Sequence, residues 1–147
     1  MSNLSIVIPC WEAYGRGDNY LRNLLHALSH QTVKDFSVCI SDQSNNDKLF
    51  EVCEEYADQL HIIYYKNTDK SGFVSNVNTA IELGEEVNSE IIKIIFQDDF
   101  ILTSTVIEET YLQLSKSTQQ WAVCGFAHTV DEGKHITMQK FLHGMIT

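Results

Sequence analysis

Short apolar runs alternate along this chain with segments whose apolar residues recur at helical spacing. The runs are rich in β-branched residues and predict five strands, at residues 4–8, 36–40, 61–65, 91–96 and 121–126. Apolar residues at offsets of three, four and seven predict four helices, at residues 18–28, 49–60, 74–86 and 103–114. Asp18 and Thr103 are the expected N-caps of the first and fourth helices. The alternation predicts an α/β fold with a mostly parallel central sheet between layers of helices.

The ends of the first four predicted strands are where a ligand is expected. In open parallel sheets, ligands bind beyond the carboxyl ends of the strands, near the point where the strand order reverses. The segments to inspect are therefore residues 9–12, 42–44, 66–72 and 97–99.

Asp98 and Asp99 carry the clearest chemical signal in these segments. Two adjacent carboxylates at the end of an apolar strand repel each other unless a cation or hydrogen-bond donors share the site. Mg²⁺ or Mn²⁺ is commonly held by one or two carboxylates together with substrate phosphates. The pattern alone leaves open a divalent metal site or a solvated loop with two exposed acids.

Other polar residues in these segments have two interpretations each. Asp42 ends the second strand and is suited to accept a hydrogen bond from a nucleobase or ribose, or to be an N-cap or Asx-turn residue for the next helix. Lys70 is either a phosphate ligand or a surface lysine, and Gly72 permits a tight entry to the third helix. Asn76 and Asn78 lie in that helix, where they contact a ligand or a neighbouring loop, or are simply exposed.

Composition narrows the partners. The length of 147 residues fits one domain, residues 1–147, and the formal net charge is −10. That charge argues against nucleic acid and against an anionic membrane, and it means that a bound phosphate needs a metal or local donors. The four cysteines form no CxxC pair, and no signal peptide or transmembrane segment is recognisable, so we expect a cytoplasmic protein with reduced thiols.

Four segments together resemble family 2 glycosyltransferases with a GT-A fold. The first strand resembles a V-I-I-P-x-Y-N motif, the second ends like D-D-G-S, a later segment resembles N-x-G-x-x-x-A-R-N-x-G, and the fourth strand ends like the metal motif D-x-D-D. The matching residues are, in chain order, Ile6–Glu12, Ser41–Ser44, then Asn67, Gly72, Asn78 and Ala80, and finally Phe96–Asp99.

This resemblance implies a three-layer GT-A domain that binds a nucleotide-diphospho-sugar, most simply a UDP-sugar, with Mn²⁺ or Mg²⁺ as cofactor. It implies a glycan or lipid-linked acceptor whose identity stays open. It places the metal on Asp98 and Asp99. The nucleotide contacts it implies are Pro9, Cys10, Trp11 and Glu12 around the base, with Asp42, Lys70, Gly72, Asn78 and Asp98.

The departures from the family pattern are equally specific. Ser41, Gln43, Val77 and Phe96 stand where the motifs have Asp, Gly, Arg and Asp, which weakens some phosphate or ribose contacts. Family members usually run well past 200 residues, and their later half supplies the acceptor site and the general base. We therefore expect a C-terminally short domain, possible homodimerisation through uncovered apolar surface, and no assigned catalytic base, since Asp131 and Glu132 are weak candidates.

Three functions remain from the sequence. The first is a metal-assisted glycosyltransferase or its donor-binding part. The second is a non-catalytic, truncated or degenerate nucleotide-sugar binding module. The third is an α/β structural domain whose acids are only solvated.

Overall fold

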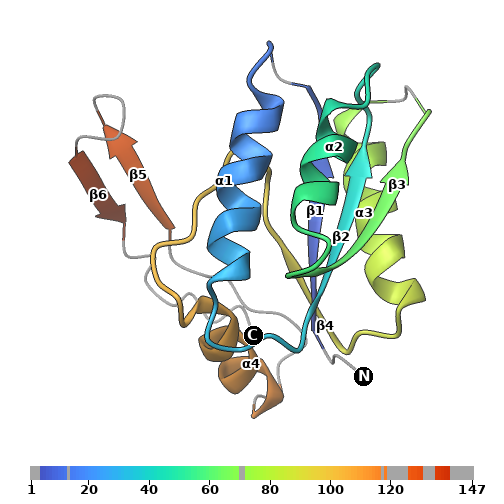
Figure 1. Cartoon of the computed structure of the whole chain (residues 1–147). Coiled ribbons are helices and arrows are strands. Elements are labelled where there is room, and N and C mark those ends of the chain that lie inside the picture. Colours follow the sequence, from blue (N-terminus) through green and yellow to red (C-terminus); the bar gives the residue numbers. More distant parts are fainter. Residues whose placement is uncertain are drawn as a thin grey trace. The chain divides into compact units, whose positions relative to one another are not determined.

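The computed structural model describes residues 4–12, 14–69, 72–116, 118, 126–130 and 135–139. The chain groups into two compact units, residues 1–115 and 116–147, and each is described here by itself. In the first unit, strands and helices alternate (Figure 1). The strands are β1 (Leu4–Cys10), β2 (Ser37–Asp42), β3 (His61–Lys66) and β4 (Ile91–Ile94). The helices are α1 (Gly17–Ser29), α2 (Lys48–Glu55), α3 (Phe73–Glu86) and α4 (Val106–Ser115).

The four strands form one parallel sheet in the order β3-β2-β1-β4. Cys10 pairs with Asp42 and Asp42 with Lys66, so the carboxyl ends of β1, β2 and β3 lie level. The chain passes from β3 through α3 to β4 on the far side of β1, so the strand order reverses between β1 and β4. The predicted α/β fold with a parallel sheet is confirmed, and the reversal marks where a ligand is expected.

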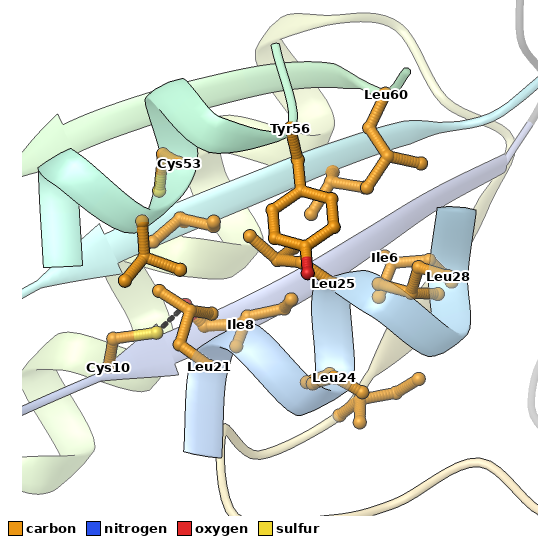
Figure 2. Close-up of a cluster of buried hydrophobic side chains, with 14 of the residues drawn as sticks. Ile6, Ile8, Cys10, Leu21, Leu24, Leu25, Leu28, Cys53, Tyr56 and Leu60 are labelled. Atoms are coloured by element: carbon orange, nitrogen blue, oxygen red, sulfur yellow. Dashed lines mark hydrogen bonds between the residues drawn. The ribbon is translucent and has the colours of Figure 1, made fainter. Parts of the chain in front are cut away.

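Helices cover both faces of this sheet, and this is why β1 and β2 are buried along their whole length. On one face, α1 and α2 pack on β1 and β2 through a large apolar cluster (Figure 2). In that cluster, Leu21 and Leu25 of α1 lie with Ile8 of β1. On the other face, α3 places Ala80 and Leu83 against the middle of the sheet.

Several element ends differ from the sequence predictions, and local tertiary contacts explain most of them. α1 begins at Gly17, with Arg16 at the N-cap position, so the prediction that Asp18 caps it was wrong. Instead, the Glu12 carboxylate accepts a hydrogen bond from the Gly17 N–H at 3.2 Å and satisfies an amide of the first turn. β4 ends at Ile94 rather than at residue 96, and a turn follows in which the Asp99 N–H donates to the Phe96 carbonyl.

Two helices are also shorter than predicted. α2 ends at Glu55, and turns connect it to β3. α4 begins at Val106, so Thr103 is not its cap, and the Thr103 hydroxyl lies 3.2 Å from that of Thr105. Ile107 of α4 is buried in the same apolar cluster as the leucines of α1.

The second unit contains an antiparallel pair, β5 (Phe126–Val130) and β6 (His135–Gln139). The predicted strand at residues 121–126 lies outside the described residues except for Phe126, which begins β5. Asp131 and Glu132 also lie outside them. Among the described helices, none combines the length and the apolar character needed to cross a bilayer.

Candidate functional site

A cavity of about 530 Å³ lies at the carboxyl ends of β1 and β4, where the strand order reverses. Its volume is within the range typical of small-molecule sites, roughly 300–1,000 Å³. It is lined by Pro9, Cys10, Trp11, Gln43, Gly72, Phe73, Asn76, Phe96, Gln97 and Asp98. The lining therefore joins the ends of three strands to the start of α3.

A second hollow, of about 460 Å³, lies along α2 and β3. Its lining includes His61, the first residue of β3, together with Phe50 and Leu60. It does not include the carboxyl ends of β1 and β4, so the topology favours the cavity beside Asp98 as the functional site.

The Gln97 side chain connects the segment that follows β4 to the segment that follows β1. Its Oε1 accepts a hydrogen bond from the Trp11 N–H at 2.6 Å, and its Nε2 donates to the Trp11 carbonyl at 2.6 Å. Gln97 is only 7% exposed, whereas the Trp11 side chain is 48% exposed and packs edge-to-face on Tyr14. Gln97 thus fixes the backbone of the loop that presents the Trp11 ring.

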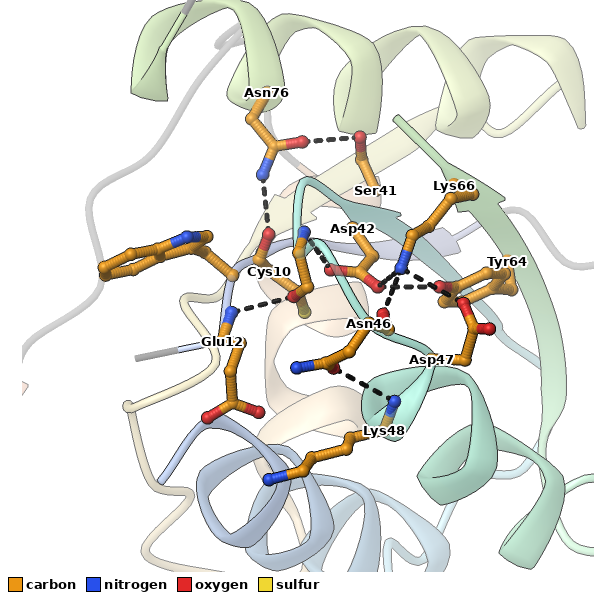
Figure 3. A network of polar contacts seen from close by, with 12 residues as sticks. Cys10, Glu12, Ser41, Asp42, Asn46, Asp47, Lys48, Tyr64, Lys66 and Asn76 are labelled. Carbon is orange, nitrogen blue, oxygen red and sulfur yellow. Dashed lines mark hydrogen bonds and ion pairs between the residues drawn. The ribbon is translucent and has the colours of Figure 1, made fainter. Parts of the chain in front are cut away.

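Asn76 plays a similar part on the α3 side (Figure 3). Its Nδ2 donates to the Cys10 carbonyl at 2.9 Å, and its Oδ1 accepts from the Ser41 hydroxyl at 2.7 Å and from Asn67 Nδ2 at 3.1 Å. The side chains of Ser41, Asn67 and Asn76 are buried. Of the two roles predicted for Asn76, the structure shows the contact with a neighbouring segment.

Asp42 is fully buried and does not line the cavity (Figure 3). Its Oδ1 accepts from the Ser44 N–H at 2.7 Å, which is the predicted Asx turn, whereas the N-cap of α2 is Asp47. Its Oδ2 accepts from the Tyr64 hydroxyl at 2.7 Å and pairs with Lys66 Nζ at 3.1 Å. Burial and the hydrogen bond to this carboxylate raise the pKa of Tyr64 above its usual value.

The two acids at the end of the fourth strand differ in their surroundings. Both are exposed, but Asp98 lines the cavity and Asp99 does not. Asp99 Oδ2 accepts a hydrogen bond from the Phe96 N–H at 2.9 Å. No three His, Cys, Asp or Glu side chains gather into a metal site within the described part of the chain. Exposed carboxylate oxygens suit Mg²⁺ or Mn²⁺, with water and substrate phosphates completing the coordination.

The other predicted nucleotide contacts divide into three groups. Pro9, Cys10, Trp11 and Gly72 line the cavity. Burial raises the pKa of the Cys10 thiol well above its usual value, so Cys10 contributes a neutral wall. Glu12 lies behind this wall, where its N–H donates to the Ser44 hydroxyl at 2.8 Å.

The remaining two predicted contacts are Asn78 and Lys70. Asn78 is exposed on α3 and is not among the residues that line the cavity. Lys70 lies outside the described residues.

Comparison with known families shows to which family this chain is related. The sequence model of the family described as glycosyl transferase family 2 matches residues 5–146. The chain belongs to glycosyl transferase family 2.

Individual relatives are distant and longer. Glycosyltransferase GlyA of Streptococcus pneumoniae serotype 4 is 22% identical over 98 residues, which are 67% of this chain and 13% of that protein. An uncharacterized glycosyltransferase, MJ1057 of Methanocaldococcus jannaschii, is 25% identical over 125 residues, which are 84% of this chain and 42% of that protein. The chain thus spans less than half the length of each of these relatives.

Solved structures of the S. aureus protein TarS are similar to this chain in fold. The fragment 1–349 superposes with a TM-score of 0.64 at 19% identity, covering 77% of this chain and 32% of that one. The same fragment in complex with UDP-GlcNAc gives a TM-score of 0.63 at 19% identity, covering 77% of this chain and 31% of that one. Because these identities are low, the similarity supports the GT-A fold and nothing more specific.

Four residues that shape the cavity of this family 2 member were not predicted as ligand contacts, although two of them lie in the segments to inspect: Gln43, Phe73, Phe96 and Gln97. Gln97 carried a signal, since an uncharged polar residue follows an apolar strand directly before two acids. Nothing local in the sequence predicts the partner of its amide, because Trp11 is 86 positions away.

Proposed function

We propose that the first unit binds a nucleotide-diphospho-sugar in the cavity at β1 and β4, as the donor site of a metal-assisted glycosyltransferase. The observation that carries this proposal is the joint lining of the cavity by Trp11 and Asp98, from opposite sides of the strand-order reversal. An aromatic ring suits a nucleobase, and a carboxylate suits a cation on the diphosphate.

The charge of the cavity supports a role for a metal. Asp98 is the one charged residue in the described lining, and it would repel a free diphosphate. A divalent cation bound by Asp98 and Asp99 would cancel their two negative charges and would offer coordination positions to the diphosphate oxygens. Gly72 and Phe73 bring the start of α3 to the cavity, where first-turn N–H groups have no partner within the helix and suit phosphate oxygens.

The family supports sugar transfer, and the solved structures of TarS with UDP and UDP-GlcNAc support a nucleotide-sugar donor, so we take a UDP-sugar as the donor. An acceptor hydroxyl oxygen attacks the anomeric carbon, the bond from that carbon to the diphosphate breaks, and UDP leaves. When bound, the metal neutralises charge on the leaving diphosphate. The hydroxyl proton passes to a base that we do not assign to any residue.

The alternative is a binding module without turnover. It is favoured by Phe96 and Val77, which stand where the family motifs have a metal-motif acid and an arginine. Release of UDP in the presence of donor and acceptor separates the two possibilities, since only the transferase turns over.

Calorimetric titration of UDP, with and without Mn²⁺, tests the donor site. We expect at least about tenfold tighter binding with Mn²⁺, and loss of most of that gain in Asp98→Asn and Asp99→Asn, since each substitution removes a charge. Asp58→Asn, an exposed acid outside the cavity, is the matched control. Binding that ignores the metal, or that survives both substitutions, would contradict the proposal.

A further inference from the structure

Phe73 and Phe96 form an aromatic pair in the lining of the cavity. Phe73 is the first residue of α3, and Phe96 lies two residues before Asp98. Their ring centroids are 5.6 Å apart and their planes are tilted by 32°. The pair therefore joins the start of α3 to the segment that follows β4.

This pair does not belong to the protein core. Neither ring is part of the two apolar clusters that hold the helices on the sheet, and Phe73 is 65% exposed. Leaving a large aromatic ring in water forgoes the free energy of burying it. The largely exposed Phe73 ring, paired at the cavity with the half-buried Phe96 ring, is therefore better explained by a ligand than by folding.

The side chain of Phe96 is unsuited to bind a metal ion or a phosphate. A phenyl ring cannot coordinate a cation or donate a hydrogen bond to a phosphate oxygen. The diphosphate and its metal are therefore served by the acids that follow, and the rings are left for an apolar surface of the donor.

We propose that Phe73 and Phe96 are the platform for the pyranose ring of the donor, an inference that rests on the proposed donor site. The donor is linear, with the base at one end, the diphosphate in the middle and the sugar at the other end. With the base beside Trp11 and the diphosphate at Asp98, the sugar lies beyond Asp98, next to Phe96. A pyranose presents C–H groups on its faces and hydroxyls at its rim, so its face packs on the rings while its hydroxyls stay near the Asp98 carboxylate.

The test separates the sugar from the rest of the donor. UDP, UDP-glucose, UDP-galactose, UDP-GlcNAc and UDP-GalNAc are titrated in Mn²⁺ into the whole chain, and each sugar gain is the ratio of the UDP Kd to the UDP-sugar Kd. In the wild type, we expect a gain of about fivefold or more for at least one sugar, as expected for covering a few tens of Å² of apolar surface.

Phe73→Leu and Phe96→Leu should each remove most of that gain and leave the Kd of UDP within about twofold, because leucine keeps apolar volume but loses the flat face. Phe50→Leu is the matched control, since Phe50 is 41% exposed and its ring pairs with Tyr64 at 5.1 Å, outside this cavity. It should change neither Kd.

Each other outcome has a distinct meaning. A wild type that binds UDP but gains nothing from any sugar overturns the platform and leaves the donor site intact. So does a sugar gain that survives both leucine variants. Leucine variants that weaken UDP and UDP-sugars equally assign the rings to the nucleotide instead. A wild type that binds no UDP, with or without Mn²⁺, refutes the proposed donor site and this inference with it.

Discussion

At the scale of single residues, the two buried side-chain amides of the cavity act on the backbone. Asn76 holds the Cys10 carbonyl, and Gln97 holds both backbone polar groups of Trp11. An amide offers a donor and an acceptor at once, so one side chain satisfies groups that a charged residue would satisfy only in part. The cavity wall is thereby fixed before any ligand binds, which lowers the ordering cost of binding.

Gln97→Met tests this fixing role. The methionine keeps a similar volume and removes both bonds to Trp11, so we expect the free energy of unfolding to fall by about 1–2 kcal/mol. We also expect several-fold weaker UDP binding, because the Trp11 loop is no longer held. Gln97→Glu keeps the acceptor for the Trp11 N–H but turns a carboxylate oxygen toward the Trp11 carbonyl, so it should be at least as destabilised as Gln97→Met.

Denaturant unfolding and UDP titration measure these effects, with the exposed Gln59→Met as control. Unchanged UDP affinity in Gln97→Met would show that the loop holds its conformation without the amide.

Tyr64 gives a prediction for alkaline pH. Its folded-state pKa is raised, chiefly by burial and by its hydrogen bond to Asp42. Below the unfolded pKa of about 10 both states are protonated, and the stabilising bond is fully present. Above it, the unfolded state loses the proton first, so the free energy of unfolding falls as pH rises. One proton sets a limit of about 1.4 kcal/mol per pH unit, and solvent contact of the ring makes the fall smaller.

Tyr64→Phe should therefore be less stable than wild type at pH 8, with the difference narrowing between pH 10 and 11. Denaturant unfolding across this range measures the difference. Tyr65→Phe, an exposed tyrosine of the same strand, should show no such convergence. A difference that stays constant would mean that Tyr64 titrates alike in both states.

At the scale of elements, the distance of α3 from the sheet is set by a glycine. A Cβ added at Gly84 would lie 2.9 Å from Val7 Cγ1 and 3.4 Å from Ile92 Cδ1. Since Val7 is fully buried in the middle of β1, it has little room to move. The helix can lie this close only because position 84 has no side chain.

Gly84→Ala should lower the free energy of unfolding by about 1 kcal/mol or more, because overpacking outweighs the gain in helix propensity. Val7→Ala removes the methyl groups in the way, so the double variant should be more stable than the sum of the single effects predicts. Asn78→Ala, on the exposed side of α3, is the control for alanine in this helix. Simple additivity in thermal or denaturant unfolding would place the strain elsewhere.

The elements also show which parts of this protein can be predicted from sequence. Helix α1 was found because burial of one face imposes a helical period, and β1 to β3 were found because their β-branched and aromatic residues form short continuous runs. Their ends were less accurate, because contacts such as Glu12 with Gly17 depend on the tertiary structure. The same limit applies to Asp42, whose burial depends on strand register, since Tyr64 and Lys66 reach it from the neighbouring strand.

The site was predictable where topology alone gathers residues. Trp11 and Asp98 follow strands that lie side by side at the reversal, so the parallel order brings them to one cavity. The role of Gln97 and the aromatic pair were missed, because they depend on side-chain partners that are distant in sequence.

At the scale of the whole molecule, the charge opposes the proposed ligand. The chain has 20 acidic and 10 basic residues, a formal net charge of −10, and in the described lining of the cavity the one charged residue is an acid. An anionic nucleotide therefore approaches against a repulsive field unless a cation accompanies it. The metal would thus act on the association of the donor as well as on the leaving group.

Ionic strength distinguishes this situation from an ordinary phosphate site. Between 0.01 and 0.15 M salt the Debye length falls from about 30 Å to about 8 Å. Metal-free UDP should bind weakly and gain affinity over this range, because salt screens the repulsion. With Mn²⁺ the affinity should fall over the same range, because salt screens the attraction between the cation, the acids and the diphosphate. Paired titrations at the two ionic strengths measure both slopes.

If metal-free UDP instead loses affinity with salt, basic residues hold the phosphates. Lys70→Ala would then show whether that lysine is responsible, since its substitution should abolish the loss.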